Sequence, residues 1–333
     1  MKISSLIFFV LTCFFVCGQN KYEEAEMILP LSLCLGNDSI PMMAQEIESL
    51  PDNVFHIKYN LEEPNLTFDL PDILREISGL SFDDNYEKLY AVQDENGIIF
   101  VIDKYSGKIE KEVNFHKDGD YEGIEVVNGI VYVIKSTGTI YEIKNLGQED
   151  QEMEKYNLFL EKENDVEGLC YDPKTNKLLM ACKGLPATGE SFEVIRYKKV
   201  VYGFDIDTKD IDPIPIYNIQ LDAIQKCLYT STTIKDSDHL KDCFSYDKDF
   251  LDFNPSAIAI HPLSKDIYVL SSSSKTLIVL NKEGDVIHVE KLDKKVHRQP
   301  EGITFDADGT LYISNEGKKD KELAKIHRFY YNK

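Results

Sequence analysis

The sequence predicts an all-β fold, a β-propeller, from a repeated motif, the spacing of that motif and the strands that follow it. Five segments share a polar residue, a small residue, an aliphatic residue and, two positions later, an aromatic or aliphatic residue. Their polar key positions are Ser78, Glu122, Glu167, Ser256 and Glu301. Successive gaps of 44, 45, 89 and 45 residues separate them. A period of about 45 residues is typical of four-stranded propeller blades.

Each motif is followed by further runs that alternate, are rich in Val, Ile, Tyr and Phe, and are bounded by turn residues such as Asn128-Gly129. Such runs indicate strands. Second strands are expected at 88–92, 131–134, 177–181, 266–270 and 310–314, and third strands at 98–102, 139–143, 200–206, 276–280 and 324–330. Fourth strands are expected at 109–115, 154–160, 211–217 and 286–292.

The fifth unit ends without a fourth strand, so we expect an N-terminal strand, at 57–61 or 66–70, to close the ring. Closure removes exposed strand edges. The gap of 89 residues leaves room for a degenerate sixth blade near residue 211. Residues 221–252 there carry no key motif and are better interpreted as a partly helical insertion. Five blades are therefore favoured over six.

Composition and charge limit the class of partner. The 333 residues include 37 Lys and Arg but 58 Asp and Glu, a net charge of −21. Phosphate contacts need clustered Lys and Arg, so a nucleic-acid-binding surface is not expected. Cations are the more natural small partners of such a surface. The absence of Trp argues against repeat families that are defined by a Trp signature.

The N-terminus predicts export. Lys2 precedes an apolar run over residues 6–16, which is too short to span a bilayer and fits a signal peptide over residues 1–18. Two alternatives stay open: a lipoprotein in which Cys17 is kept and acylated, which would attach the protein to a membrane, and an uncleaved anchor. All three place the protein in the periplasm or at the cell membrane surface. Residues 19–53 are expected to form a flexible tether, and residues 54–333 the propeller domain.

The motifs EISGLSFD, YEGIEVV, VEGLCYDP, NPSAIAIHP and QPEGITFDADGTLYISNEG resemble those of the SdiA-regulated family. That family consists of exported β-propellers and includes YjiK-like proteins and a calcium-regulated propeller. The resemblance covers residues from about 55 to 333 and implies a periplasmic or membrane-attached propeller, related to phytase-like propellers, with a role in calcium handling. Ser78 and Ser256 depart from the family's Glu, so a site that needs five acids is excluded.

Equivalent positions of a propeller's innermost strands converge on the central channel, so Glu122, Glu167 and Glu301 should meet near one mouth. Carboxylates that lie so near to one another repel, unless they take up protons, recruit N–H donors or bind a cation. Oxygen ligands suit Ca²⁺, and Ser78, Ser256 and Asn315 could add neutral oxygens. The alternative is structural, with each Glu bonded to backbone N–H groups of the next blade.

The ends of the second strands should reach the same mouth with Asp94, Lys135, Lys183, Ser271 and Asn315-Glu316. Lys135 and Lys183 could neutralise the acids without a metal, or hold a small anionic ligand such as a phosphate ester. Asp94 to Gly97 resembles a fragment of a calcium loop but is interpreted as a hairpin turn. His116 and His297 could reach the mouth as general bases, although solvated loop positions are expected for both.

Three functions compete. The first is a Ca²⁺-binding propeller with a binding or sensing role at the cell envelope. The second is a metal-assisted hydrolase, either a phytase-like phosphoesterase or a lactonase. The third is a scaffold for protein interactions. The sequence does not decide whether the protein is an enzyme, and the resemblance favours the first function.

Overall fold

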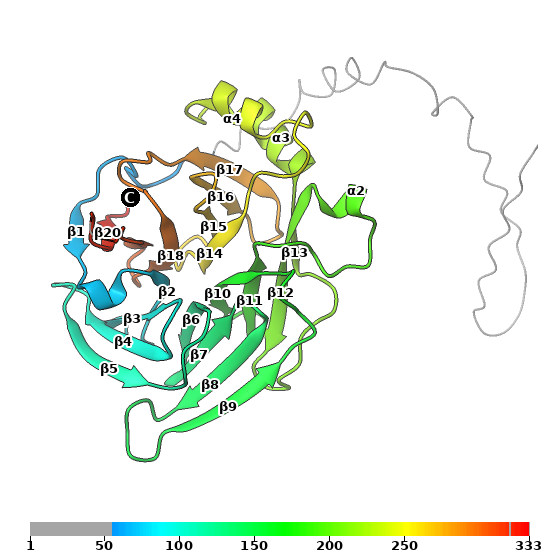
Figure 1. Ribbon diagram of the computed structural model, residues 1–333. Helices are drawn as coiled ribbons and strands as arrows, with labels where there is room; N and C mark the ends of the chain where they lie inside the picture. Colours follow the sequence, from blue (N-terminus) through cyan, green and yellow to red (C-terminus); the bar gives the residue numbers. More distant parts are fainter. Residues whose placement is uncertain (1–54, 320, 333) are drawn as a thin grey trace, which may run out of the picture. The chain divides into compact units, whose positions relative to one another are not determined.

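The chain forms a ring of five four-stranded antiparallel sheets (Figure 1), as described over residues 55–319 and 321–332 of the computed structural model. The five-bladed propeller expected from the motif spacing is thereby confirmed. The expected signal peptide, Cys17 and the tether lie outside the described residues.

Each blade is named here by its innermost strand. The β2 blade contains β2 (Ile77–Phe82), β3 (Lys88–Gln93), β4 (Ile98–Asp103) and β5 (Ile109–Asn114). The β6 blade contains β6 (Tyr121–Val127), β7 (Ile130–Lys135), β8 (Thr139–Lys144) and β9 (Glu152–Asn157). The β10 blade contains β10 (Val166–Asp172), β11 (Lys177–Cys182), β12 (Lys198–Asp205) and β13 (Tyr217–Gln220). The β14 blade contains β14 (Pro255–Ile260), β15 (Ile267–Ser271), β16 (Thr276–Leu280) and β17 (Val286–Lys291).

The β18 blade is built from both ends of the described chain. Its strands are β18 (Pro300–Phe305), β19 (Leu311–Asn315), β20 (Lys325–Phe329) and β1 (Leu66–Asp69). β1 pairs antiparallel with β20, with Leu66 opposite Arg328 and Asp69 opposite Lys325. The expected closure by an N-terminal strand is therefore confirmed, and the strand at 66–70, of the two candidates, provides it.

One expected strand is wrong. Residues 211–217 were expected to form the outer strand of the β10 blade, but Ile211 makes only an isolated bridge to Phe204, and β13 starts at Tyr217. Pro213 and Pro215 lie between them. Proline has no N–H to donate to a ladder and fixes φ, so pairing cannot begin until after the second proline.

Helices are few and short, and they lie mainly between the β10 and β14 blades. They are η3 (Asp72–Leu74), α2 (Phe192–Ile195), α3 (Leu221–Thr230) and α4 (Ser237–Cys243). Helix α3 buries Leu221, Ile224 and Leu228 in the same apolar cluster as Val289 of β17. In the described part of the chain, no helix has the length and apolar character needed to cross a membrane.

Five buried apolar clusters fill the five interfaces between neighbouring blades. The cluster between the β18 and β2 blades, for example, joins Phe68 of β1, Tyr312 of β19 and Phe100 of β4. Burial of apolar side chains is the dominant favourable contribution to folding. Each blade is therefore held mainly by its two neighbours, and the ring is stable only when it is closed.

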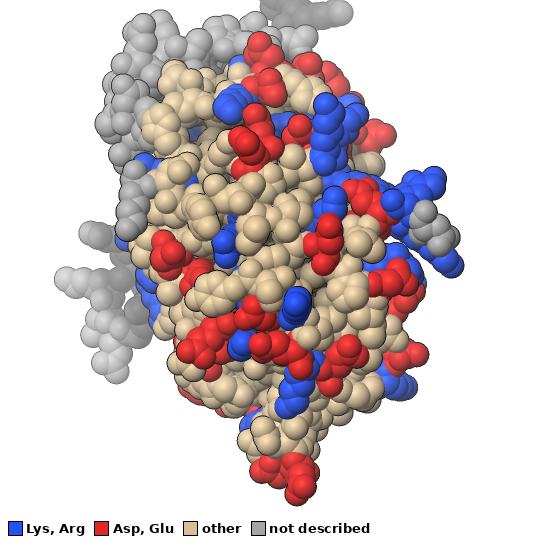
Figure 2. All heavy atoms as spheres, turned by 90° about the vertical axis from the view of Figure 1, so that its left-hand side faces the viewer, with Lys and Arg blue, Asp and Glu red and all other residues tan. Residues whose placement is uncertain are grey.

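The surface charge is mixed. On the face drawn in Figure 2, Lys and Arg side chains are interspersed with Asp and Glu, and no continuous basic surface is seen there. A duplex needs a basic stripe or patch to neutralise its phosphates.

Candidate functional site

The innermost strands bring their key positions together at one end of the channel. Glu122, Glu167, Ser256 and Glu301 line one small space of about 10 Å³. The hydroxyl of Ser78 donates to Glu122 Oε2 at 2.9 Å. We call these five residues the key-position ring. The space inside has room for about one water molecule, so the channel is nearly closed at this level.

The two serines of the ring join neighbouring blades. Ser78 Oγ donates to the main-chain carbonyl of Glu122 at 2.8 Å, and Ser256 Oγ donates to that of Pro300 at 2.9 Å. These bonds give both buried hydroxyls a structural role, and their coordination of a cation stays a prediction. Asn315 is 3% exposed, and its side-chain oxygen and nitrogen have no hydrogen-bond partner among the described residues.

The two lysines expected at the mouth are separated. Lys183 Nζ lies 2.7 Å from Glu167 Oε1, whereas Lys135 Nζ lies 5.6 Å from the centroid of the Tyr121 ring. Burial raises the pKa of Glu167, and the ammonium of Lys183 opposes that rise. Of the two candidates for an anion site, only Lys183 contacts an acid of the ring.

The acids of the ring depend on side chains rather than on backbone N–H groups. Within residues 55–319 and 321–332, Glu122 accepts from Ser78, Glu167 from Lys183, and Glu301 from Ser272 and Gln299. Burial raises the pKa of Glu122 and Glu301, and the neighbouring carboxylate of Glu167 raises that of Glu122 further. The backbone anchoring expected under the structural alternative is not seen in these residues.

A second set of polar residues surrounds the same mouth. Two residues before each key position, the chain carries Glu76, Asp120, Asp165, Asn254 and Gln299. In four blades the main-chain carbonyl of the residue at this position accepts a hydrogen bond. The donor is the main-chain N–H of the first residue after the second strand of the same blade. The pairs are Asp94–Glu76 at 3.3 Å, Ser136–Asp120 at 3.2 Å, Lys183–Asp165 at 2.8 Å and Glu316–Gln299 at 2.9 Å.

In three of these pairs the side chains are complementary. Ser136 donates its hydroxyl to Asp120, Lys183 Nζ lies 3.9 Å from Asp165, and Gln299 donates its amide to Glu316. In the β2 blade the pair consists of two acids, Glu76 and Asp94. Arg75 Nε lies 3.0 Å from Glu76 Oε1, but Asp94 Oδ1 is buried without a partner among the described residues.

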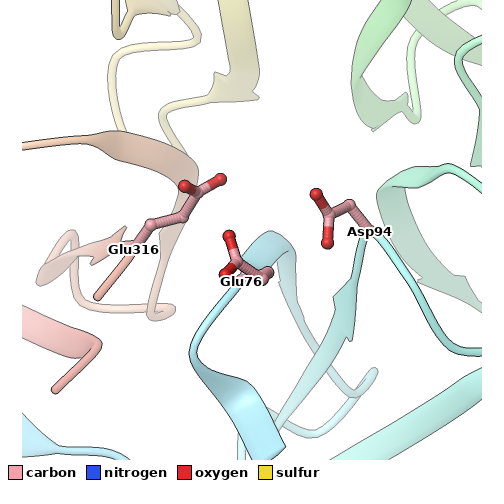
Figure 3. A group of neighbouring side chains, drawn as sticks. All are labelled: Glu76, Asp94 and Glu316. Carbon is pink, nitrogen blue, oxygen red and sulfur yellow. The ribbon is translucent and has the colours of Figure 1, made fainter. Parts of the chain in front are cut away.

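Glu316 of the β18 blade adds a third carboxylate to this pair. Figure 3 shows Glu76, Asp94 and Glu316 pointing toward a common space. One oxygen of each lies within 4.8 Å of an oxygen of the other two, and this is the only such group found among the described residues. We call it the mouth cluster. The three key-position glutamates do not form a comparably tight group.

The carboxylates of the mouth cluster carry more negative charge than the neighbouring cationic side chains neutralise. Burial, followed by the carboxylates of Glu76 and Glu95, raises the pKa of Asp94 to about 6. Burial also raises the pKa of Glu316 to about 9, and Glu301 is the first neighbouring acid that adds to the effect. The mouth cluster is therefore partly protonated near neutral pH or holds a cation.

The sequence reasoning had missed Glu76 and had treated Asp94 and Glu316 only as strand ends. The turn at Asp94 is real, since Gln93 Oε1 accepts the N–H groups of Glu95 and Asn96. The same turn also positions the Asp94 carboxylate. A signal was present, because an oxygen-bearing side chain lies two residues before every key position.

The two candidate histidines lie in different surroundings. His297 is fully buried, with its ring Nε2 2.8 Å from the carbonyl of Leu61, so the expectation of a solvated loop position is wrong. The ring of His116 lies 5.0 Å from that of Tyr141. His116 is partly exposed in the loop after β5, as expected, whereas His297 packs in the interior.

The raised pKa values predict a pH dependence in the absence of metal. Folding raises the pKa of Asp94 from 3.8 to about 6 and that of Glu316 from 4.5 to about 9. The folded state thus binds more protons than the unfolded state in this window, and stability falls as pH rises from about 5 to about 9. With screening of these partly exposed groups, we expect the melting temperature in chelator to fall by about 3–6 °C.

Differential scanning calorimetry at several pH values measures this dependence. The double variant Asp94→Asn with Glu316→Gln should flatten the profile, because neither amide titrates. A wild-type melting temperature that rises between pH 5 and 9 would contradict the assignment.

The fold and the acidic mouth define a five-bladed β-propeller whose channel entrance is lined by carboxylates from several blades. A family model described as SdiA-regulated matches residues 51–318, and the chain belongs to the SdiA-regulated family. The resemblance stated from the sequence is confirmed. No curated protein matches the chain.

Solved structures share the architecture at low sequence identity. The glutaminyl cyclase of Myxococcus xanthus is 11% identical, with 80% of this chain and 95% of that chain covered and a TM-score of 0.52. A luciferin-regenerating enzyme is 13% identical, with 80% and 95% covered and a TM-score of 0.49. The first likeness shows the fold alone, and no activity is carried over from either protein.

Proposed function

We propose that this protein binds Ca²⁺ at the channel mouth, with Glu76, Asp94 and Glu316 as its carboxylate ligands, in a binding or sensing role at the cell envelope. The observation that carries the proposal is the pairing of two acids, Glu76 and Asp94, at the position where three other blades pair complementary side chains.

A hard divalent cation satisfies this arrangement best. Ca²⁺ takes six to eight oxygen ligands at flexible geometry, and three carboxylates supply up to six oxygens. The buried Asp94 Oδ1, which has no partner among the described residues, would gain one. Glu301 raises the pKa of Glu316 and so adds negative potential without being a ligand itself.

The test compares thermal melts in calcium and in chelator. Wild type should gain stability by mass action, about 2.7 kcal/mol at a hundredfold excess of Ca²⁺ over Kd. Asp94→Asn should lose most of this gain, because an amide supplies one neutral oxygen in place of a carboxylate. The matched control is Asp120→Asn in the next blade, which lies at the position equivalent to Glu76, is not a proposed ligand, and should keep most of the gain.

A third variant separates the two sets of acids at the mouth. Glu167→Gln removes an acid of the key-position ring and leaves the mouth cluster intact. If the ring rather than the cluster holds the cation, this variant loses the calcium effect and Asp94→Asn keeps it. A wild-type melting temperature that does not change up to millimolar Ca²⁺ would contradict both assignments.

We also propose that the protein is exported, as a chain cleaved after the signal peptide or, alternatively, as a lipoprotein held at a membrane surface by a lipid on Cys17. The support is the charged start and apolar run of residues 1–18. Cell fractionation with labelled palmitate, on wild type and Cys17→Ser, distinguishes a lipoprotein from a cleaved, freely exported chain.

A further inference from the structure

A second and larger cavity lies at the other end of the innermost strands. Its volume is about 290 Å³, and it is lined by the last residues of these strands and by the turns that follow them, among them Phe82, Tyr171, Ile260 and Phe305. The key-position ring lies where the same strands begin. Because the space between the two levels is only about 10 Å³, the cavity is a compartment separate from the mouth cluster.

One carboxylate in the lining has no cationic partner. Glu125 of β6 accepts from Ser81 Oγ at 3.2 Å and from the backbone N–H of Tyr171. Among the described residues, no Lys, Arg or His nitrogen lies within ion-pair distance of it. A half-buried acid of this kind attracts a positive group that enters the cavity.

The other charged side chains in the lining are already engaged. Asp83 accepts the N–H groups of Glu87 and Lys88, Asp84 accepts those of Asn128 and Gly129, and Lys265 Nζ donates to the carbonyl of Pro262. Asp83 and Asp84 are thus fixed by turn N–H groups, whereas Glu125 lies on an innermost strand and is the acid in the lining that we expect a ligand to contact.

The walls suit an organic cation better than a metal ion. Tyr86 and Tyr171 contribute partly exposed aromatic rings, and the faces of such rings attract ammonium groups. One carboxylate falls well short of the six to eight oxygens that Ca²⁺ takes. The volume is close to the lower limit, about 300 Å³, of small-molecule sites.

We propose that this cavity binds a small organic cation, an amine or quaternary ammonium compound with an apolar body, whose charge lies against Glu125 and whose body packs on the aromatic walls. The site is independent of the calcium site, because the two lie at opposite ends of the innermost strands.

Ligand binding should depend on pH in a defined direction. Burial raises the pKa of Glu125 to about 8, with a small contribution from Asp84 and opposing hydrogen bonds from Ser81 and Tyr171. The other titratable groups around it are Asp83, Tyr86, Tyr132, Cys170, Tyr171 and Lys265. A cation binds the ionised carboxylate and so releases a proton. Affinity should therefore rise about tenfold per pH unit below pH 8 and level off above it.

Isothermal titration calorimetry on the full chain, with benzyltrimethylammonium as the cation and benzyl alcohol as the neutral probe, tests the proposal. The charge of the first probe does not titrate, so any pH dependence belongs to the protein. We expect the cation to bind at least about tenfold more tightly than the alcohol at pH 8.5, and Glu125→Gln to lose at least about tenfold in affinity. Glu122→Gln, on the same strand at the other end of the channel, should bind the cation as wild type does.

The wild-type pH profile needs no variant and decides the matter even if Glu125→Gln does not fold. No measurable binding of the cation, equal affinities for cation and alcohol, or an affinity that falls as pH rises toward 8 would each overturn the proposal. Loss of cation binding on saturation with Ca²⁺ would overturn the independence of the two sites.

Discussion

Deletion of residues 55–70 is expected to unfold the whole propeller. The segment supplies β1, which pairs with β20 over four residues. It also supplies Tyr59 and Leu61 to one interface between blades, and Phe68 and Leu70 to another. Full burial of such side chains contributes about 1.5–3 kcal/mol each. Their combined loss is comparable to the total stability of about 5–15 kcal/mol of a typical domain.

The matched control is deletion of residues 19–50, which removes a longer segment outside the described residues. Circular dichroism melts of the two truncated proteins and wild type give the comparison. We expect a cooperative transition near the wild-type temperature for the control, and none, or one lowered by tens of degrees, for the deletion of 55–70. Equal melts for both truncations would disprove the closure argument.

Gly79→Ala is expected to be strongly destabilising. A Cβ at this position would lie 2.7 Å from the backbone nitrogen of Ile124 and 2.9 Å from the carbonyl oxygen of Glu122 in the next blade. These are main-chain atoms of a neighbouring strand and cannot move aside as a side chain would. Overpacking of this kind costs about 1–3 kcal/mol or more, a fall in melting temperature of about 4–10 °C.

The repeat provides a natural control. Ala257 occupies the position equivalent to Gly79 in the β14 blade, where its methyl group is already packed in an apolar cluster. Ala257→Gly should therefore cost only about 1 kcal/mol, from lost burial and the flexibility of glycine. A thermal melt of Gly79→Ala that matches wild type would show that the innermost strands have room to separate.

Much of the architecture follows from the sequence because a repeat fixes geometry. Five copies of one motif specify five equivalent strands, and closure then requires one strand from the N-terminal side. The same logic brought Glu122, Glu167 and Glu301 to one end of the channel. The outer strand of the β10 blade was mispredicted, since Pro213 and Pro215 outweigh an apolar pattern.

The repeat did not determine which way individual side chains point. Lys135 is the last residue of β7, whereas Lys183 is the first residue after β11. Side chains alternate along a strand, so a difference of one residue sends them to opposite sides. Lys135 accordingly packs on Tyr121, while Lys183 contacts Glu167.

The sequence by itself predicted five blades, closure by an N-terminal strand and the family, because these depend on the period and motifs of the repeat. Only the tertiary structure decided the composition of the mouth cluster and placed Glu125, without a cationic partner among the described residues, in a second cavity. Glu316 joins Glu76 and Asp94 because ring closure sets the β18 blade beside the β2 blade. The three carboxylates repel one another, and can therefore bind a cation, because they are half-buried and lie close together. Both conditions depend on how the blades are packed, and no single segment of the chain encodes that packing.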